Sequence, residues 1–275
     1  MCKMKRAGRC SISMVLLGVM LLAVVVLGGE KGQGDKMSTG ERFHKETGLT
    51  WAGVVGDVFG AKPKKPEEFK VYKGAEKMEL SKPEYKGVTV EEAIEKRRSV
   101  RDYSGKAITK EQLSQLLFSA QGITGSSFDK GLRAAPSAGA LYPFEVYVVV
   151  NNVGELPRGI YHYSVRDHTL EAVKKGDFRK QITDAGLEQG MLGEAGVTFV
   201  LSAIFDRVCC KYGQRGYRYV YMEAGHISQN IYLEAVSLGL GSVCAGAFLD
   251  DKVNELIGVD GRSEAAIYLH AVGTL

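Results

Sequence analysis

The pattern of apolar and polar positions predicts most of the regular structure after residue 88. Short apolar runs bounded by turn residues are typical of strands. They predict, in chain order, a strand at 145–150, a hairpin over 159–173, and strands at 197–205, 241–248 and 265–272. The run at 197–205 is nearly all apolar, so we expect it in the middle of a sheet with both faces buried.

Helical spacing predicts helices at about 89–98, 109–122, 217–238 and 251–258. Thr89 with Glu92, and Thr109 with Gln112, have the spacing of a capping box. Helices and strands mix without a strict βαβ alternation, and no G-x-G-x-x-G joins a strand to a helix. We therefore expect an α+β sandwich, with a central mixed β-sheet flanked by helices, rather than a Rossmann fold.

The first 29 residues differ in composition from the rest of the chain. Residues 1–10 are basic, and residues 11–29 carry no charge. This pattern predicts a signal peptide or an uncleaved membrane anchor, and the apolar core at about 12–27 has a length between the two. By the positive-inside rule, we expect the remainder to be extracytoplasmic, either secreted or anchored to the cytoplasmic membrane through this segment alone.

Residues 30–87 are predicted to form a linker. The stretch is rich in Lys and Glu, contains Pro63, Pro66 and Pro83, and has low hydrophobicity, as extended or disordered segments do. Residues 48–60 are an exception and suit a short amphipathic helix. The folded domain is accordingly expected at 88–275.

Composition mainly excludes functions. A formal net charge of +4, part of it in the leader, is not the concentrated basic patch that nucleic-acid binding requires. The body holds Cys209, Cys210 and Cys244, an odd number that does not indicate a disulfide framework; we expect small, mostly buried side chains. No residues have metal-ligand spacing, so no metal site is expected.

Three short stretches suggest a ligand site. Arg97, Arg98, Ser99 and Arg101 crowd into five residues. They form either a solvated basic face or a phosphate site, because the planar guanidinium matches phosphate oxygens. The stretches 135–144 and 239–248 are rich in small residues, which let a backbone approach a flat ligand, although each could be only a turn.

Together, and in this order, these stretches resemble the FMN-dependent nitroreductase family. RRSVRDYSG, APSAGALYPFEVYVV, GIYHY and the run from KYG to GSV are similar to the branch that contains SagB-type dehydrogenases and azoline oxidases. The resemblance covers about residues 88–273. It implies a nitroreductase-like sandwich that forms a homodimer, with FMN in the dimer interface, NAD(P)H or another compound as the electron donor, and a small-molecule substrate.

The resemblance also implies roles for individual residues. Arg97, Ser99 and Arg101, with Arg98 beside them, would hold the FMN phosphate and ribityl chain. The ribityl chain and ring would be lined by Pro136, Ser137, Ala138, Gly139, Ala140 and Tyr142. Cys244, Gly246 and Ala247 would offer backbone N–H groups to the polar edge of the ring.

Two departures from the family pattern stand out. Ala140 and Tyr142 replace the Asn and Gln of many members, so side-chain contacts there would be lost. The sequence also stops at Leu275, whereas relatives continue to a basic residue near the phosphate. The arginine cluster would then carry more of the phosphate binding.

Lys211 and Tyr212 match the catalytic Lys–Tyr pair of azoline oxidases. Such a pair near a flavin could remove a proton while hydride leaves the substrate; the alternative is a surface loop after strand 197–205. The sequence thus predicts an FMN-dependent oxidoreductase. The rivals are an azoline-type peptide dehydrogenase, favoured by the Lys–Tyr pair but not by the leader, and a non-catalytic flavin-binding protein, suggested by Ala140.

Overall fold

The computed structural model describes residues 37–49, 60–127 and 130–275. The chain divides into two compact units between Glu46 and Thr47, and the described part of the first contains helix α2 (Thr39–Glu46). The predicted leader lies outside the described residues, as does most of the predicted helix at 48–60. No helix in the described ranges is long and apolar enough to cross a membrane.

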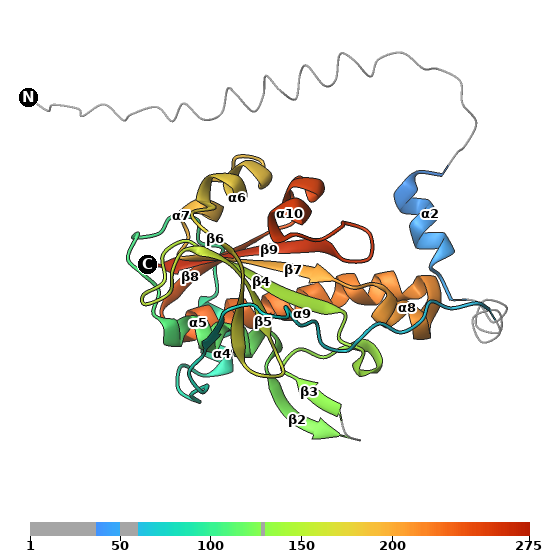
Figure 1. The fold of residues 1–275 in the computed structure, drawn as a ribbon, viewed down its shortest axis with the longest axis horizontal. Coiled ribbons are helices and arrows are strands. Elements are labelled where there is room, and N and C mark those ends of the chain that lie inside the picture. Colours follow the sequence, from blue (N-terminus) through green and yellow to red (C-terminus); the bar gives the residue numbers. More distant parts are fainter. Residues whose placement is uncertain (1–36, 50–59, 128–129) are drawn as a thin grey trace, which may run out of the picture. The chain divides into compact units, whose positions relative to one another are not determined.

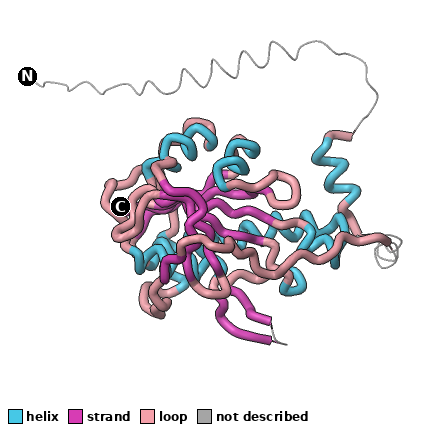
Figure 2. The backbone as a smooth tube through the Cα atoms, in the orientation of Figure 1, coloured by secondary structure: helices cyan, strands magenta, loops and turns pink. Residues whose placement is uncertain are grey.

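The second unit is built on a seven-stranded sheet with the order β1-β6-β5-β4-β7-β9-β8 (Figures 1 and 2). Its strands are β1 (Lys77–Glu79), β4 (Phe144–Val150), β5 (Gly159–Ser164), β6 (Thr169–Lys175), β7 (Val197–Ala203), β8 (Leu240–Ala245) and β9 (Ala265–Thr274). The paired strands run antiparallel, and isolated bridges such as Ser99 to Ser242 add parallel contacts. β7 is central and buried along its whole length, as predicted.

Helices cover both faces of this sheet, which confirms the expected α+β sandwich (Figure 1). The first core cluster joins one face to α5 (Lys110–Gln121) and α9 (Gly216–Ser237), with α4 (Val90–Lys96) against α9. The second joins the other face to α6 (Arg179–Ala185), α7 (Met191–Glu194) and α10 (Asp250–Ile257). The predicted capping box opens α5, where Thr109 and Gln112 exchange side-chain to backbone hydrogen bonds.

Several elements of the body were not predicted. A small hairpin of β2 (Ile123–Ser127) and β3 (Lys130–Arg133) follows α5. Helix α8 (Asp206–Tyr212) and the short turn η2 (Gly213–Arg215) stand where a surface loop was one interpretation. Lys211 and Tyr212 therefore end a helix rather than lie on a loop.

The folded unit also begins earlier than residue 88. We call residues 60–79 the N-terminal strap; its end, β1, pairs with β6 at the edge of the sheet. Lys70 Nζ contacts Glu264 at 2.5 Å and the Tyr147 hydroxyl at 2.7 Å, and the Tyr72 N–H donates to Glu171. This part of the predicted linker has little regular secondary structure before β1, but individual side chains fix it to the folded unit although its overall composition is polar.

Candidate active site

The predicted site residues fall into two groups, and the first surrounds Tyr232 on α9. Residues 97–101 run beside β8, where the Val100 N–H donates to the Ser242 carbonyl at 2.9 Å. Ser99 Oγ lies 3.1 Å from the Tyr232 hydroxyl, and the Arg97 guanidinium lies 5.0 Å from the centre of its ring. Tyr232, which the sequence analysis missed, thus joins the arginine stretch to β8. We call these residues the arginine group.

The arginines of this group have no carboxylate partner within the described ranges. Arg98 Nη1 donates to the carbonyls of Glu95 and Arg97, and Arg101 Nη1 lies 3.4 Å from the Ser99 carbonyl. Arg98 and Arg101 are exposed, and Arg97 is half-buried. Guanidinium groups gathered without a counter-anion suit a phosphate dianion. This set of donors therefore fits the phosphate of FMN.

Cys244 also belongs to the arginine group, although not in the predicted way. Its N–H donates to the Tyr232 hydroxyl at 3.0 Å, and its Sγ lies 2.8 Å from the Tyr268 hydroxyl. The Cys244 N–H is thus already occupied and is not a spare donor for a flavin ring. Gly246 and Ala247, just beyond β8, are exposed and remain available as the predicted backbone donors.

A buried histidine packs against the ring of Tyr232. His270 on β9 packs edge-on against the Tyr232 ring, with ring centres 4.5 Å apart, and its Nδ1 bonds to Ser228 at 2.8 Å. Burial lowers the pKa of His270 to about 3. The ring is therefore neutral at physiological pH and acts as a packing partner rather than a charge.

The second group brings the Pro136–Tyr142 loop against the end of α8. Gly139 has a φ of 65°, and a Cβ there would lie 2.8 Å from the Tyr212 hydroxyl and 2.9 Å from Lys211 Nζ. A side chain at this position would therefore collide with both groups. Tyr212 also packs edge-on against Tyr219 of α9, with ring centres 5.0 Å apart. The structure thus brings the predicted catalytic pair to the predicted flavin loop, and we call this the Lys–Tyr group.

Contacts among Ser137, Tyr142 and Arg133 fix the conformation of this loop. Ser137 Oγ accepts the Tyr142 N–H at 2.9 Å, and the Tyr142 hydroxyl accepts the Arg133 N–H at 3.1 Å. The Arg133 guanidinium lies 4.6 Å from the centre of the Tyr142 ring. Ala140 and Tyr142 have φ values of 50° and 45°, which such contacts must hold in place. The Tyr142 side chain is buried, so it supports the loop and is not on the face predicted to meet a flavin.

Glu223 on α9 lies near Ser137 and was missed by the sequence analysis. It is 2% exposed, and neither carboxylate oxygen has a hydrogen-bond partner within the described ranges. Burial raises the pKa of Glu223 to about 7, with Ser137, Arg133 and Gln121 opposing part of that rise. The carboxyl therefore changes charge near neutral pH. An acidic residue within a largely apolar helix was the available signal.

The two groups lie at different positions along α9. Tyr219 contacts the Lys–Tyr group, and Tyr232 anchors the arginine group. At 1.5 Å per helical residue, these two tyrosines are separated by roughly 20 Å along the axis. The arginine group and the Lys–Tyr group of one chain therefore lie apart along α9.

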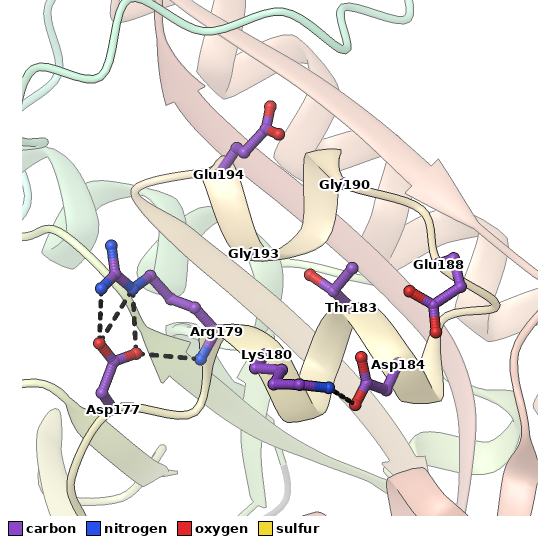
Figure 3. Close-up of a pocket in the computed structure, with 9 residues that line it drawn as sticks. All are labelled: Asp177, Arg179, Lys180, Thr183, Asp184, Glu188, Gly190, Gly193 and Glu194. Atoms are coloured by element: carbon purple, nitrogen blue, oxygen red, sulfur yellow. Dashed lines mark hydrogen bonds and ion pairs between the residues drawn. The ribbon is translucent and has the colours of Figure 1, made fainter.

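A separate hollow of about 580 Å³ lies beside α6 and α7 (Figure 3). Asp177 pairs there with Arg179, and Lys180 pairs with Asp184. None of the predicted site residues lines it. Its pairs are mutual and exposed, so the hollow is not part of the candidate site.

This chain is similar to several known proteins. A protein of Methanocaldococcus jannaschii, named as a candidate nitroreductase, is 38% identical over 180 residues, covering 66% of this chain and 89% of that protein. The microcin B17-processing protein McbC of Escherichia coli is 31% identical over 146 residues, covering 51% of this chain and 54% of McbC.

A solved structure of a protein named as a candidate nitroreductase is also similar to this chain. The crystal structure of a candidate nitroreductase from Anabaena variabilis matches with a TM-score of 0.70 and 28% identity, covering 89% of this chain and 49% of the other. This chain thus spans about half the length of that protein. Residues 94–274 match the nitroreductase family itself. The chain therefore belongs to the nitroreductase family.

Proposed function

We propose that the protein is an FMN-dependent oxidoreductase that passes hydride between NAD(P)H, or another donor, and a small acceptor. The observation that carries the proposal is the arginine group: Arg97 lies over the Tyr232 ring, Ser99 meets its hydroxyl, and the described residues hold no carboxylate partner for Arg97, Arg98 or Arg101. These residues would hold the FMN phosphate, and Gly246 and Ala247 would donate to the ring edge. FMN, when bound, would supply the reversible acceptance of hydride.

The separation of the arginine group and the Lys–Tyr group along α9 supports a homodimer. The arginine group of one copy and the Lys–Tyr group of the other would complete each site. The face of α9 that carries Tyr221, Met222 and Gly225 is exposed, with Tyr221 48% and Met222 55% accessible. A second copy packed on this face would bury these side chains and bring the unlike groups together.

The Lys–Tyr group supplies the acid–base chemistry of the proposal. The Tyr212 hydroxyl and the Lys211 ammonium converge where Gly139 leaves room. Tyr212 would exchange a proton with the substrate, and Lys211 would stabilise negative charge that develops on oxygen.

Purification of the full chain with added FMN tests the proposal. We expect a dimer that retains about one FMN per chain, is bleached by NAD(P)H without oxygen, and is reoxidised by a nitroaromatic or a quinone. A dimer that retains no FMN would overturn the proposal. A protein that retains FMN but exchanges electrons with none of these compounds would instead favour a non-catalytic flavin-binding role.

A second candidate function is oxidation of azoline rings in a peptide. It is favoured by the position of Lys211 and Tyr212 at the flavin loop and by the similarity to McbC, which is named as a processing protein. The FMN-loaded protein would then remove two hydrogens from a thiazoline peptide, which mass spectrometry detects. No mass change, with normal turnover of quinones, would exclude this function.

A further inference from the structure

We infer that Arg207 is a positioning residue for the function proposed above. It fixes helix α8, and hence Lys211 and Tyr212, against the Pro136–Tyr142 loop. The N-terminal strap, which precedes the part of the chain that matches the nitroreductase family, supplies part of this hold. The inference rests on the proposed function for its chemistry, but its structural part is independent of any ligand.

The contacts of Arg207 join separate segments through one guanidinium. Nε donates to the Glu67 carbonyl in the strap at 2.8 Å. Nη1 donates to the Tyr142 carbonyl at the end of the loop at 3.2 Å and lies 2.7 Å from Glu145 Oε1 on β4. Arg207 is 1% exposed, so these acceptors replace water. A lysine has no planar fork and cannot reproduce this set of bonds.

Glu145 is itself held by a second charged residue, His162. His162 Nε2 lies 2.7 Å from Glu145, and its Nδ1 lies 2.9 Å from Glu171, which also accepts the Tyr72 N–H of the strap. Because each ring nitrogen faces a carboxylate, both must donate and the ring is an imidazolium. Burial would raise the pKa of Glu145, but the bonds to His162 and Arg207 outweigh it and hold that pKa at about 2.

The strap also contacts the opposite end of α8. Lys62 Nζ donates to the Lys211 carbonyl at 3.0 Å. The strap therefore reaches the first turn of the helix through Arg207 and the last turn through Lys62. Both contacts lie on the helix that carries the proposed catalytic pair.

Helix α8 needs such support because it is short. It has seven residues, and no side chain caps its N-terminus. Helices of this length are unstable in isolation, so packing and anchoring decide where α8 lies. A small displacement would separate Lys211 and Tyr212 from their place beside Gly139. Misplacement of reacting groups by about 1 Å can slow catalysis by about 10²-fold.

The test compares Arg207→Lys and Lys62→Met with the parent in the full-length protein loaded with FMN. Lys64→Met is the matched control, because Lys64 is also an exposed lysine of the strap. The first readout is hydrogen–deuterium exchange of the α8 amides, with and without FMN. The second is kcat and KM for whichever nitroaromatic, quinone or thiazoline-peptide probe the parent turns over.

We expect Arg207→Lys to speed exchange of the α8 amides by about tenfold or more and to lower kcat by about 10–100-fold. FMN affinity should stay within about threefold, since Arg207 is outside the arginine group. Lys62→Met should speed exchange in the last turn by about threefold, the loss of one exposed hydrogen bond. Lys64→Met should match the parent.

Unchanged α8 exchange in a folded Arg207→Lys variant would overturn the inference, as would equal behaviour of Lys62→Met and Lys64→Met. If Arg207→Lys does not fold, the comparison of the two exposed lysines decides. Failure of the proposed function would look different, because the parent itself would then retain no FMN while the exchange measurements could still be made.

Discussion

The arginine group and the Lys–Tyr group are held in place by different physical means. The arginine group relies on main-chain pairing with β8 and on hydroxyl bonds around Tyr232, with its guanidinium groups largely in solvent. The Lys–Tyr group is braced by buried ion pairs that involve Arg207, Glu145 and His162. Removing one partner of a buried pair is costly, whereas exposed cations are free to meet a ligand. Geometry is thus fixed most firmly where we propose the chemistry, and charge is left available where we propose cofactor binding.

The largest effect should come from removing the Tyr212 hydroxyl. We expect Tyr212→Phe to slow oxidation of the substrate by about 10²–10⁴-fold, the usual contribution of a general acid or base. The FMN spectrum and reduction by NAD(P)H should be nearly unchanged, because hydride transfer to the flavin needs no proton from this side chain. Stopped-flow measurement of each half-reaction checks this.

Tyr217→Phe is the matched control for that experiment, because Tyr217 stacks on Phe205. Loss of FMN from Tyr212→Phe would mean that Tyr212 is structural. If Tyr212→Phe and the parent protein have equal rates in both half-reactions, the Lys–Tyr pair has no catalytic role.

A substitution in the arginine group should have an effect of intermediate size. Arg97→Ala should weaken FMN binding by roughly tenfold to a hundredfold, corresponding to the loss of ~1.5–3 kcal/mol from one charge-assisted contact. The melting temperature of the flavin-free protein should hardly change, because the contact of Arg97 with the Tyr232 ring contributes little. Fluorescence titration with FMN provides the measurement, and Arg262→Ala is an exposed control. Unaltered affinity would remove Arg97 from the phosphate site.

The smallest effect concerns the pH dependence of stability near the Lys–Tyr group. Burial raises the pKa of Glu223 to about 7, so the folded state holds a proton that the unfolded state has already lost above its ordinary pKa of 4.5. The free energy of unfolding should therefore fall as pH rises from about 4.5 through 7. Glu223→Gln should remove about 2 kcal/mol of the decline between pH 5 and pH 8.

Urea unfolding at both pH values measures this decline. Glu188→Gln, at an exposed carboxyl, should retain it. If Glu223→Gln shows the same decline as the parent, Glu223 is ionised in the folded protein across this range.

Apart from β1, the strands of the sheet were predicted because they lie in apolar runs or in the predicted hairpin. Strands β4 and β7 are buried along their whole length, and their apolar runs identify them as strands. The hairpin of β2 and β3 was missed because Ile123 and Leu132 are the only apolar side chains of its two strands, so these contain no apolar run. Helix α8 was missed because it is short and has no capping residue.

The site was predictable in its parts but not in its assembly. The stretches at 97–101, 136–142 and 211–212 carry short motifs, and these could be matched to a family. Tyr232 lies on a helix whose pattern predicts packing, so nothing local distinguishes it from core residues. Glu223 on the same helix carries one local signal, an acidic residue in a largely apolar stretch. Arg207, Glu145 and His162 form a network across three elements, and such pairing depends on tertiary structure that a linear pattern does not contain.

The position of β9 has a consequence for how the chain acquires its fold during synthesis. This strand, Ala265–Thr274, is the last in the sequence, yet it lies between β7 and β8. On the ribosome, the main-chain neighbour that β8 has before these residues emerge from the exit tunnel is the bridge from Ser99 to Ser242, and its partner strand is still missing. Lys70 likewise cannot form its ion pair until Glu264, 194 residues later, has been synthesised. Long-range contacts of this kind slow folding. The nascent chain should therefore remain open to chaperones and proteases until β9 has emerged.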